Sequence, residues 1–287
     1  MSNGTKGDGG KGNPNGVYLV IPYYPDDMGS RPLPSAYPFW SCQSIHLGGS
    51  PYAGQKLVPG QTVELAVEAI NYGAQTASAV CIVFWANPTT SFTNASVNFI
   101  GTAPLTLAAH AVNITGPISW TIPEGTPEHI CLLAEVTAPA DPIQQPATYD
   151  AATDRHYAQQ NVQVLTATPG QQIRIGFFMA NPGVVKTKYW LEVTHLAASH
   201  QSLRHILPRS AVLIKAQQIH LKTPSHARSQ VHKLDVELDR GESLEVELSA
   251  LVPADAKPGS TIVLQALQYQ HLRHQPVGGL GVVVHVI

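Results

Sequence analysis

Histidine is the most frequent residue type in this sequence that could bind a metal. The chain has 13 His, and nine of them lie after residue 194. Two runs are regular, at intervals of five residues in His195, His200 and His205 and of six in His220, His226 and His232. Zinc needs three or four ligands that converge at about 2.0–2.1 Å. The closest pair, His271 and His274, would point to opposite faces of a strand. The spacing therefore favours surface histidines, and no metal site is predicted.

Aspartates in two loops are the candidates for calcium. Asp26 and Asp27 share one loop, and Asp141, Asp150 and Asp154 share another. Calcium takes six to eight oxygen ligands, and this spacing matches neither an EF-hand loop nor a calcium-binding repeat. Capping of turns by Asp side chains is the favoured interpretation. A calcium-binding module remains an alternative.

Candidate nucleophiles are scarce. His129 and Cys131 would share one face of a strand, but the apolar neighbours Ile130 and Leu132 favour a buried, structural thiol. The chain has no Gly-x-Ser-x-Gly elbow, Walker loop, dinucleotide fingerprint or His-Glu-x-x-His motif. We therefore expect no enzyme and no cofactor, and a hydrolase is the weakest alternative. The three cysteines, an odd number, fit no complete disulfide framework.

Charge and hydropathy exclude two classes of partner. The net charge is −2, so no overall field attracts nucleic acid. The sequence contains no run of about 18 apolar residues, so no insertion into a membrane is predicted. Met1 to Gly16 lacks the apolar stretch of a signal peptide. We expect a cytoplasmic location, or export without a classical signal peptide. The charge is divided, with 5 Lys/Arg against 11 Asp/Glu up to residue 166 and 12 against 8 after it. This division favours head-to-tail contacts between copies.

Alternating apolar and polar residues predict an all-β fold. From Thr62 to Ala69 the alternation is strict, as in a strand with one buried and one wet face. The segment Ala79 to Trp85 is nearly all apolar and predicts a central strand covered on both sides. Phe39 to Ile45 reads as a further short strand, and Gln160 to Val164 as the strand that closes the first half. The 23 Gly and 23 Pro suit short strands with tight turns.

The two halves share an order of features. Pro-Gly, an alternating strand, an Asn-x-Gly turn and an aromatic strand follow one another after residue 59 and again after residue 169. Each half holds about seven short strands, which is the pattern of an immunoglobulin-like sandwich. We predict two tandem immunoglobulin-like β-sandwich domains, with a disordered tail over residues 1–16, a first domain over 17–166 and a second over 167–287.

The first half resembles the bacterial cell-adhesion-related domain family, a set of immunoglobulin-like sandwiches. The resemblance covers about residues 17–166 and rests on turns and aromatic core positions. The matching segments are Pro59 to Val63, Asn71-Tyr72-Gly73, Val80 to Trp85, Ile100-Gly101, Trp120 before Cys131, and Ala158 to Val162. The resemblance implies an adhesion or scaffold module in a bacterial protein.

The segment from Tyr23 to Trp40, called here the lead-in segment, is the predicted contact region. It combines four prolines with the aromatic residues Tyr23, Tyr24, Tyr37, Phe39 and Trp40. Aromatic side chains supply contact area at low entropic cost, and proline orders the backbone before binding. We therefore predict a non-catalytic structural or interaction protein, a subunit or accessory of a larger assembly, that binds protein partners or itself as an oligomer. A carbohydrate-binding module is the other alternative.

Overall fold

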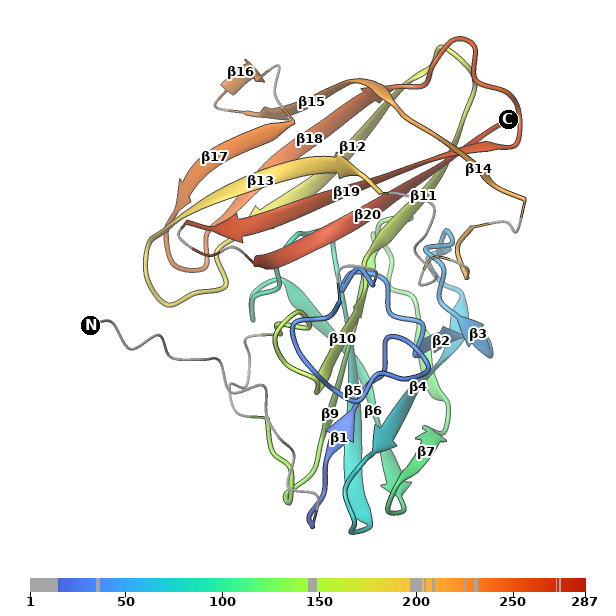
Figure 1. Cartoon of the computed structure of the whole chain (residues 1–287), viewed down its shortest axis with the longest axis vertical. Coiled ribbons are helices and arrows are strands. Elements are labelled where there is room, and N and C mark those ends of the chain that lie inside the picture. The colour runs from blue at the N-terminus through green and yellow to red at the C-terminus, as the bar shows by residue number, and fades with distance from the viewer. Residues whose placement is uncertain are drawn as a thin grey trace.

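The computed structural model describes residues 15–34, 37–143, 149–196, 203, 205–207, 210–224, 226–229, 232–271, 273 and 275–287. The predicted tail lies almost wholly outside these residues. The described chain consists of β-strands and loops and contains no α-helix (Figure 1). None of its segments is a helix that could cross a membrane.

The first half forms a six-stranded and a four-stranded sheet. In the six-stranded sheet the order is β1-β4-β2-β3, and β7 and β8 pair with β4; in the other the order is β10-β9-β5-β6. The strands are β1 (Leu19–Val20), β2 (Ile45–Leu47), β3 (Ser50–Pro51), β4 (Thr62–Asn71), β5 (Ala77–Ala86), β6 (Val97–Leu107), β7 (Ala111–Ile114), β8 (Ile118–Thr121), β9 (Cys131–Thr137) and β10 (Tyr157–Gln160).

The second half also forms a six-stranded and a four-stranded sheet. The first has the order β11-β20-β19-β13-β17, with β14 beside β19, and the second has the order β12-β18-β15-β16. The strands are β11 (Val162–Ala167), β12 (Gln172–Ala180), β13 (Thr187–His195), β14 (Val212–Ile214), β15 (Gln217–Thr223), β16 (His226–Ser229), β17 (Lys233–Leu238), β18 (Ser243–Leu251), β19 (Ser260–Gln270) and β20 (Pro276–Val286).

Strand β4 shows how the sequence pattern produces the sheets. Leu65, Val67 and Ala69 are buried, while Glu64 and Glu68 point away from the core. The buried face of β4 packs against buried residues of β5 and β9, so the two sheets of the first half lie face to face. Each fully buried Leu or Val side chain contributes about 1.5–3 kcal/mol relative to exposure. The prediction of an all-β sandwich structure is therefore confirmed at this level, and the two halves have separate main cores.

The turn that follows β4 is held by a buried asparagine. Asn71 Oδ1 accepts a hydrogen bond from the Gly73 N–H at 2.9 Å. Its Nδ2 donates to the carbonyl oxygens of Gln75, Leu107 and Ala108 at 2.7–3.3 Å. One side chain thus ties the β4–β5 turn to the end of β6.

Asn181 makes the same set of bonds in the second half. Its Oδ1 accepts from the Gly183 N–H at 2.8 Å. Its Nδ2 donates to the carbonyl oxygens of Val185, Leu238 and Asp239 at 2.9–3.0 Å. The β12–β13 turn is therefore tied to the end of β17 as the β4–β5 turn is tied to β6. This shared bonding gives the similarity between the Asn-x-Gly turns a structural basis.

The chain passes from the first pair of sheets to the second at Asn161 (Figure 1). β10 pairs with β9, whereas β11 runs parallel to β20. The segment Gln160 to Val164 is therefore divided between two sheets and is not one closing strand. Asn161 itself donates to the carbonyl oxygens of Thr89 and Gly279, and so bonds to both halves.

Trp40 is the main apolar contact between the halves. It is fully buried in a small cluster with Val162, Val263 and Val283. Its ring lies against Gly281, where an added Cβ would come within 2.2 Å of the ring. The Gly281 position on β20 therefore leaves the space that the indole fills.

A buried amide supplies a further polar contact between the halves. Gln268 Oε1 accepts from Thr90 Oγ1 at 2.5 Å and from Ser91 Oγ at 3.2 Å. Its Nε2 donates to the Ala180 carbonyl oxygen at 2.7 Å. Gly278 lies beside the same loop, and an added Cβ there would come within 1.9 Å of the Thr90 oxygen. The loop that holds Thr90 and Ser91 therefore packs tightly against β19 and β20 of the second half.

Two strand predictions differ from the structure. Phe39 to Ser41 lie in a turn, where the Ser41 N–H donates to the Pro38 carbonyl oxygen, and the strand begins only at Ile45. The turn directs Trp40 toward the second half. Strand β5 is central, between β6 and β9, but Val80 on its outer face is 40% exposed. The outer face is thus only partly covered, with Ile82 and Phe84 partly buried and Val80 exposed.

The pairing of β11 with β20 predicts that a fragment of the second half is more stable when it includes β11. Leu165 and Ala167 pack against the core of the second half. A fragment 162–287 is therefore expected to be more stable than a fragment 167–287 by about 2 kcal/mol or more, since the latter loses the burial of Leu165. Thermal melts followed by circular dichroism make the comparison. Equal melting temperatures would contradict it and would favour the predicted division at residue 166.

Candidate interaction site

A pocket of about 300 Å³ lies where the lead-in segment meets β2 and β4. Strands β1 and β2 pair with β4 at successive positions, and Glu68 and Ile70 of β4 line the pocket between them. The remaining lining residues are Pro22, Tyr23, Tyr24, Pro25, Gln43, Ser44, His46 and Pro51. The pocket thus combines a carboxylate, an imidazole and an amide with aromatic and proline surfaces.

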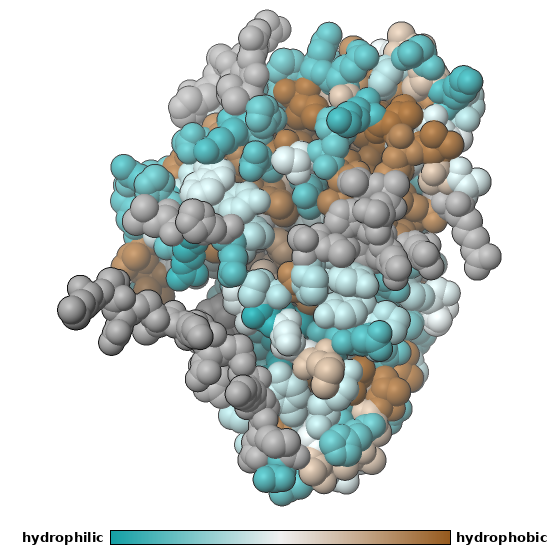
Figure 2. Space-filling view, in the orientation of Figure 1, coloured by the Kyte–Doolittle hydropathy of each residue, from teal (hydrophilic) through white to brown (hydrophobic). Residues whose placement is uncertain are grey.

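An exposed apolar strip continues from the pocket across the sheet. The pairing of β4 with β7 places Val112 opposite Ile70 and Ile114 opposite Glu68. Val112 is 57% exposed and Ile114 is 45% exposed. Hydrophobic residues accordingly appear on the surface over β4 and β7, at the lower right of Figure 2. We call Ile70, Val112 and Ile114 the apolar strip.

A buried ion pair holds the pocket wall from behind. Asp27 is fully buried and accepts from the Tyr23 and Gly29 N–H groups at 3.0 and 2.9 Å. Arg31 Nη1 lies 3.0 and 3.2 Å from the two Asp27 oxygens, and only 4% of its side chain is exposed. These bonds fix the backbone around Tyr24, so this wall is ordered before any ligand arrives.

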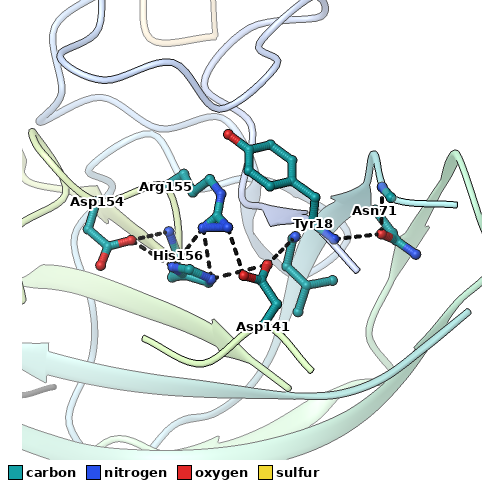
Figure 3. A network of polar contacts seen from close by, with 8 residues as sticks. Tyr18, Asn71, Asp141, Asp154, Arg155 and His156 are labelled. Carbon is teal, nitrogen blue, oxygen red and sulfur yellow. Dashed lines mark hydrogen bonds and ion pairs between the residues drawn. The ribbon is translucent and has the colours of Figure 1, made fainter. Parts of the chain in front are cut away.

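A second ion pair fixes β1 (Figure 3). Asp141 Oδ2 accepts from the Leu19 N–H at 2.6 Å, and Asp141 Oδ1 lies 2.7 Å from Arg155 Nη2. The Arg155 carbonyl oxygen accepts from the Ile21 N–H, and its guanidinium lies 3.9 Å from the centroid of the Tyr18 ring. The network therefore positions the residues that lead directly into Pro22.

His156 extends this network to Asp154. Its Nδ1 lies 2.7 Å from Asp154 Oδ1, and its Nε2 lies 3.3 Å from Asp141 Oδ2. Burial lowers the pKa of His156, but the hydrogen bonds to the two carboxylates outweigh burial, so the pKa is raised. Burial raises the pKa of Asp154, but its bonds to His156 prevail, so that pKa is lowered. Burial raises the pKa of the nearby Glu135.

The raised pKa of His156 predicts a pH dependence of stability. Its protonation contributes stability that is fully present below the ordinary His pKa of 6.5 and is lost as pH rises through the raised pKa of the folded state. The contribution of Asp154 has the opposite sign and is lost in acid. We expect the stability difference between wild type and His156→Gln to shrink from pH 5.5 to pH 8.5. Urea unfolding of both proteins measures it, and a difference that is constant over this range would contradict the assignment.

The five aromatic residues predicted to bind partners lie in different surroundings. Tyr23, Phe39 and Trp40 are buried within the chain, and the Tyr23 hydroxyl donates to the Phe39 carbonyl oxygen at 2.7 Å. Tyr24 and Tyr37 are partly exposed and stack with ring centroids 4.1 Å apart. Only this stacked pair can meet a partner without rearrangement. Sequence reasoning missed Glu68, Val112 and Ile114, because only strand pairing brings them to the pocket.

The other candidate residues form internal contacts. Asp150 accepts from the Ala152 N–H and the Thr153 hydroxyl, which is turn capping. The Cys131 thiol donates to Asn161 Oδ1, and burial raises its pKa to about 12. No group of three metal-ligating side chains gathers in the part of the chain that the structure describes.

The predicted His runs are only partly described. His200 and His274 lie outside the described residues, as does the side chain of His226. His195 Nε2 accepts from the Ala216 N–H at 2.9 Å, and His205 Nε2 lies 3.0 Å from Gln160 Nε2. The two described members of the five-residue run, His195 and His205, therefore bond within the chain.

No family model and no curated protein matches the chain. Weak structural neighbours include two bacterial adhesins. The CupB6 tip adhesin from Pseudomonas aeruginosa is 10% identical, with 85% of this chain and 98% of that chain covered and a TM-score of 0.25. The collagen adhesin (CNA) from S. aureus is 8% identical, with 86% and 94% covered and a TM-score of 0.25.

A family 123 glycoside hydrolase from Clostridium perfringens is a further neighbour. It is 9% identical, with a TM-score of 0.30, and the match covers 44% of this chain and 23% of the hydrolase. This chain therefore spans less than a quarter of that enzyme. Likenesses of this size carry no inference about function, and membership of the bacterial cell-adhesion-related family stays a prediction.

Proposed function

We propose that this chain is a non-catalytic structural protein of two tandem immunoglobulin-like β-sandwich domains that assembles into larger structures through protein–protein contacts. The observation that carries the proposal is the pre-ordered pocket beside the exposed apolar strip. Apolar surface that is contiguous and rimmed by polar groups is typical of interaction sites.

Strand topology supports the immunoglobulin-like assignment. In each half a short turn leads from a strand of one sheet to a strand of the other, from β4 to β5 and from β12 to β13. In the first half β5 pairs with β6 and β9, and in the second β13 pairs with β17 and β19. The matching bonds of Asn71 and Asn181 hold these two turns in equivalent ways. Two copies of one architecture account for this agreement.

The state of the thiols supports a role without catalysis. Burial raises the pKa of Cys42, Cys81 and Cys131 to about 12 in each case. The thiolate is the reactive form of cysteine, so these groups are protonated and poor nucleophiles near neutral pH. The proposal therefore assigns them to the packing of the core.

Sedimentation velocity over a range of protein and salt concentrations tests assembly. We expect the average sedimentation coefficient to rise with protein concentration and to fall as salt screens the contacts between the acidic and basic halves. A single monomeric species at all concentrations up to about 1 mM, where association would be weaker than about 4 kcal/mol, would contradict the proposal.

A carbohydrate-binding module is a second candidate, because Tyr24, His46 and Glu68 line one pocket. An aromatic ring beside polar groups is suited to a sugar, whose faces are apolar and whose rim is polar. Titration with methyl glycosides, followed by ligand-observed NMR, tests this function. Loss of the signal in Tyr24→Ala, with the fold intact, would support it, and no signal from any glycoside would exclude it.

A further inference from the structure

The turn between β12 and β13 carries a second exposed apolar surface. Val184 is 74% exposed and Val185 is 65% exposed, and Lys186 follows them with 55% of its side chain exposed. We call residues 181–186 the tip. Hydrophobic residues are visible there at the left edge of Figure 2, over the yellow loop of Figure 1.

The tip is held in place by Asn181. The side chain bonds to the Gly183 N–H and the Val185 carbonyl oxygen within the turn, and to the end of β17. A pre-ordered turn loses little conformational entropy on binding. Two adjacent exposed valines on an ordered turn are suited to an apolar surface on a partner.

The tip and the pocket face are complementary in type, and Lys186 of the tip is opposite in charge to Glu68 of the pocket face. The valines of the tip match the apolar strip, and Lys186 matches Glu68, which lines the pocket next to that strip. The half that holds the pocket carries 5 Lys/Arg against 11 Asp/Glu, and the half that holds the tip carries 12 against 8. Lys186 lies 3.2 Å from Asp239, but both side chains are more than half exposed, so this bond is easily exchanged.

We propose that the tip of one copy docks on the apolar strip and pocket of the next copy, with Lys186 beside Glu68. This inference rests on the proposed function and adds the surfaces that make the contact. The tip and the strands β4 and β7 lie on opposite sides of the molecule in Figure 1. A contact between two different surfaces is heterologous, so each added copy brings one free surface, and the assembly either grows as a filament or closes into a ring.

A charge exchange tests the pairing of Lys186 with Glu68. Glu68→Lys and Lys186→Glu each place like charges in the contact and are expected to weaken the association constant about tenfold or more. The double variant restores opposite charges and is expected to recover most of the association. Glu64→Lys is the matched control, because Glu64 lies on the same face of β4 but does not line the pocket. Equal association by wild type and both single variants would overturn the pairing.

Mixing two blocked variants tests the head-to-tail arrangement. Val184→Asp/Val185→Asp blocks the tip, and Val112→Asp/Ile114→Asp blocks the strip. All four positions are exposed, and thermal melts check that each variant is folded. Each variant alone is expected to be monomeric, and an equimolar mixture is expected to form dimers that do not grow further. Sedimentation velocity measures all three samples.

The outcomes separate this inference from the proposed function. Wild-type protein that stays monomeric would contradict both. Wild-type protein that assembles while the blocked variants also assemble would overturn only the tip-to-pocket contact. Monomeric variants that form no dimer when mixed would also overturn it, because one intact tip and one intact pocket face would then be insufficient.

Discussion

Replacing Trp40 by alanine is expected to lower the free energy of unfolding by about 3–5 kcal/mol. The indole is fully buried between the halves and fills the space left by Gly281. Its removal leaves a cavity beside Val162, Val263 and Val283, which lie on paired strands of one sheet and cannot fill the cavity unless the two halves move. Urea unfolding followed by circular dichroism measures the loss.

Trp190→Ala is the matched control for this prediction. Trp190 is only partly buried, on the outer face of β13, where it stacks on Tyr269 with ring centroids 5.0 Å apart. Its replacement is expected to cost about 1 kcal/mol, mostly for the lost aromatic pair. If Trp40→Ala lowered the free energy of unfolding by no more than Trp190→Ala, the tight packing of Trp40 between the halves would be contradicted.

Asp27→Asn is expected to destabilise the chain by about 3–5 kcal/mol. The substitution keeps the size of the side chain but leaves the Arg31 guanidinium buried without its counter-charge. It also weakens the acceptor of the Tyr23 and Gly29 N–H groups. The pocket wall around Tyr24 is expected to loosen, which hydrogen exchange at these amides would detect along with the loss in unfolding free energy.

Two further variants separate the buried pair from a general effect of charge. Asp26→Asn removes an exposed carboxylate one residue earlier and is expected to change stability by less than about 0.5 kcal/mol. Asp27→Leu combined with Arg31→Met removes both charges and is expected to recover part of the loss, because a buried pair can be replaced by apolar groups at little cost. Equal effects of Asp26→Asn and Asp27→Asn would contradict the assignment of the pair.

Individual strands and turns could be predicted from the sequence where alternation and turn residues agree. Thr62 to Ala69 has one buried face, and the Asn-x-Gly turns after β4 and β12 mark equivalent corners. The lead-in segment could not be predicted in the same way. Its aromatic residues look like a contact surface, but Tyr23, Phe39 and Trp40 are buried by contacts with residues more than 100 positions away.

The candidate site was also predictable only where it depends on residues close together in the sequence. Tyr24 and the prolines near it stand together in the sequence and could be recognised there. The apolar strip depends on the register of β4 with β7, which the sequence does not show. Asp141, Asp150 and Asp154 were candidates for calcium, and the ion-pair partners Arg155 and His156 directly follow Asp154 in the sequence. Opposite charges close to a cluster of carboxylates are the signal that favours internal ion pairs over a metal.

The most direct test of the central claim is native mass spectrometry of the purified chain, with and without chelator. We expect a series of oligomers whose masses are multiples of the chain alone, unchanged by chelator and shifted toward monomer at higher ionic strength. A strictly monomeric protein that carries a stoichiometric metal ion would contradict it.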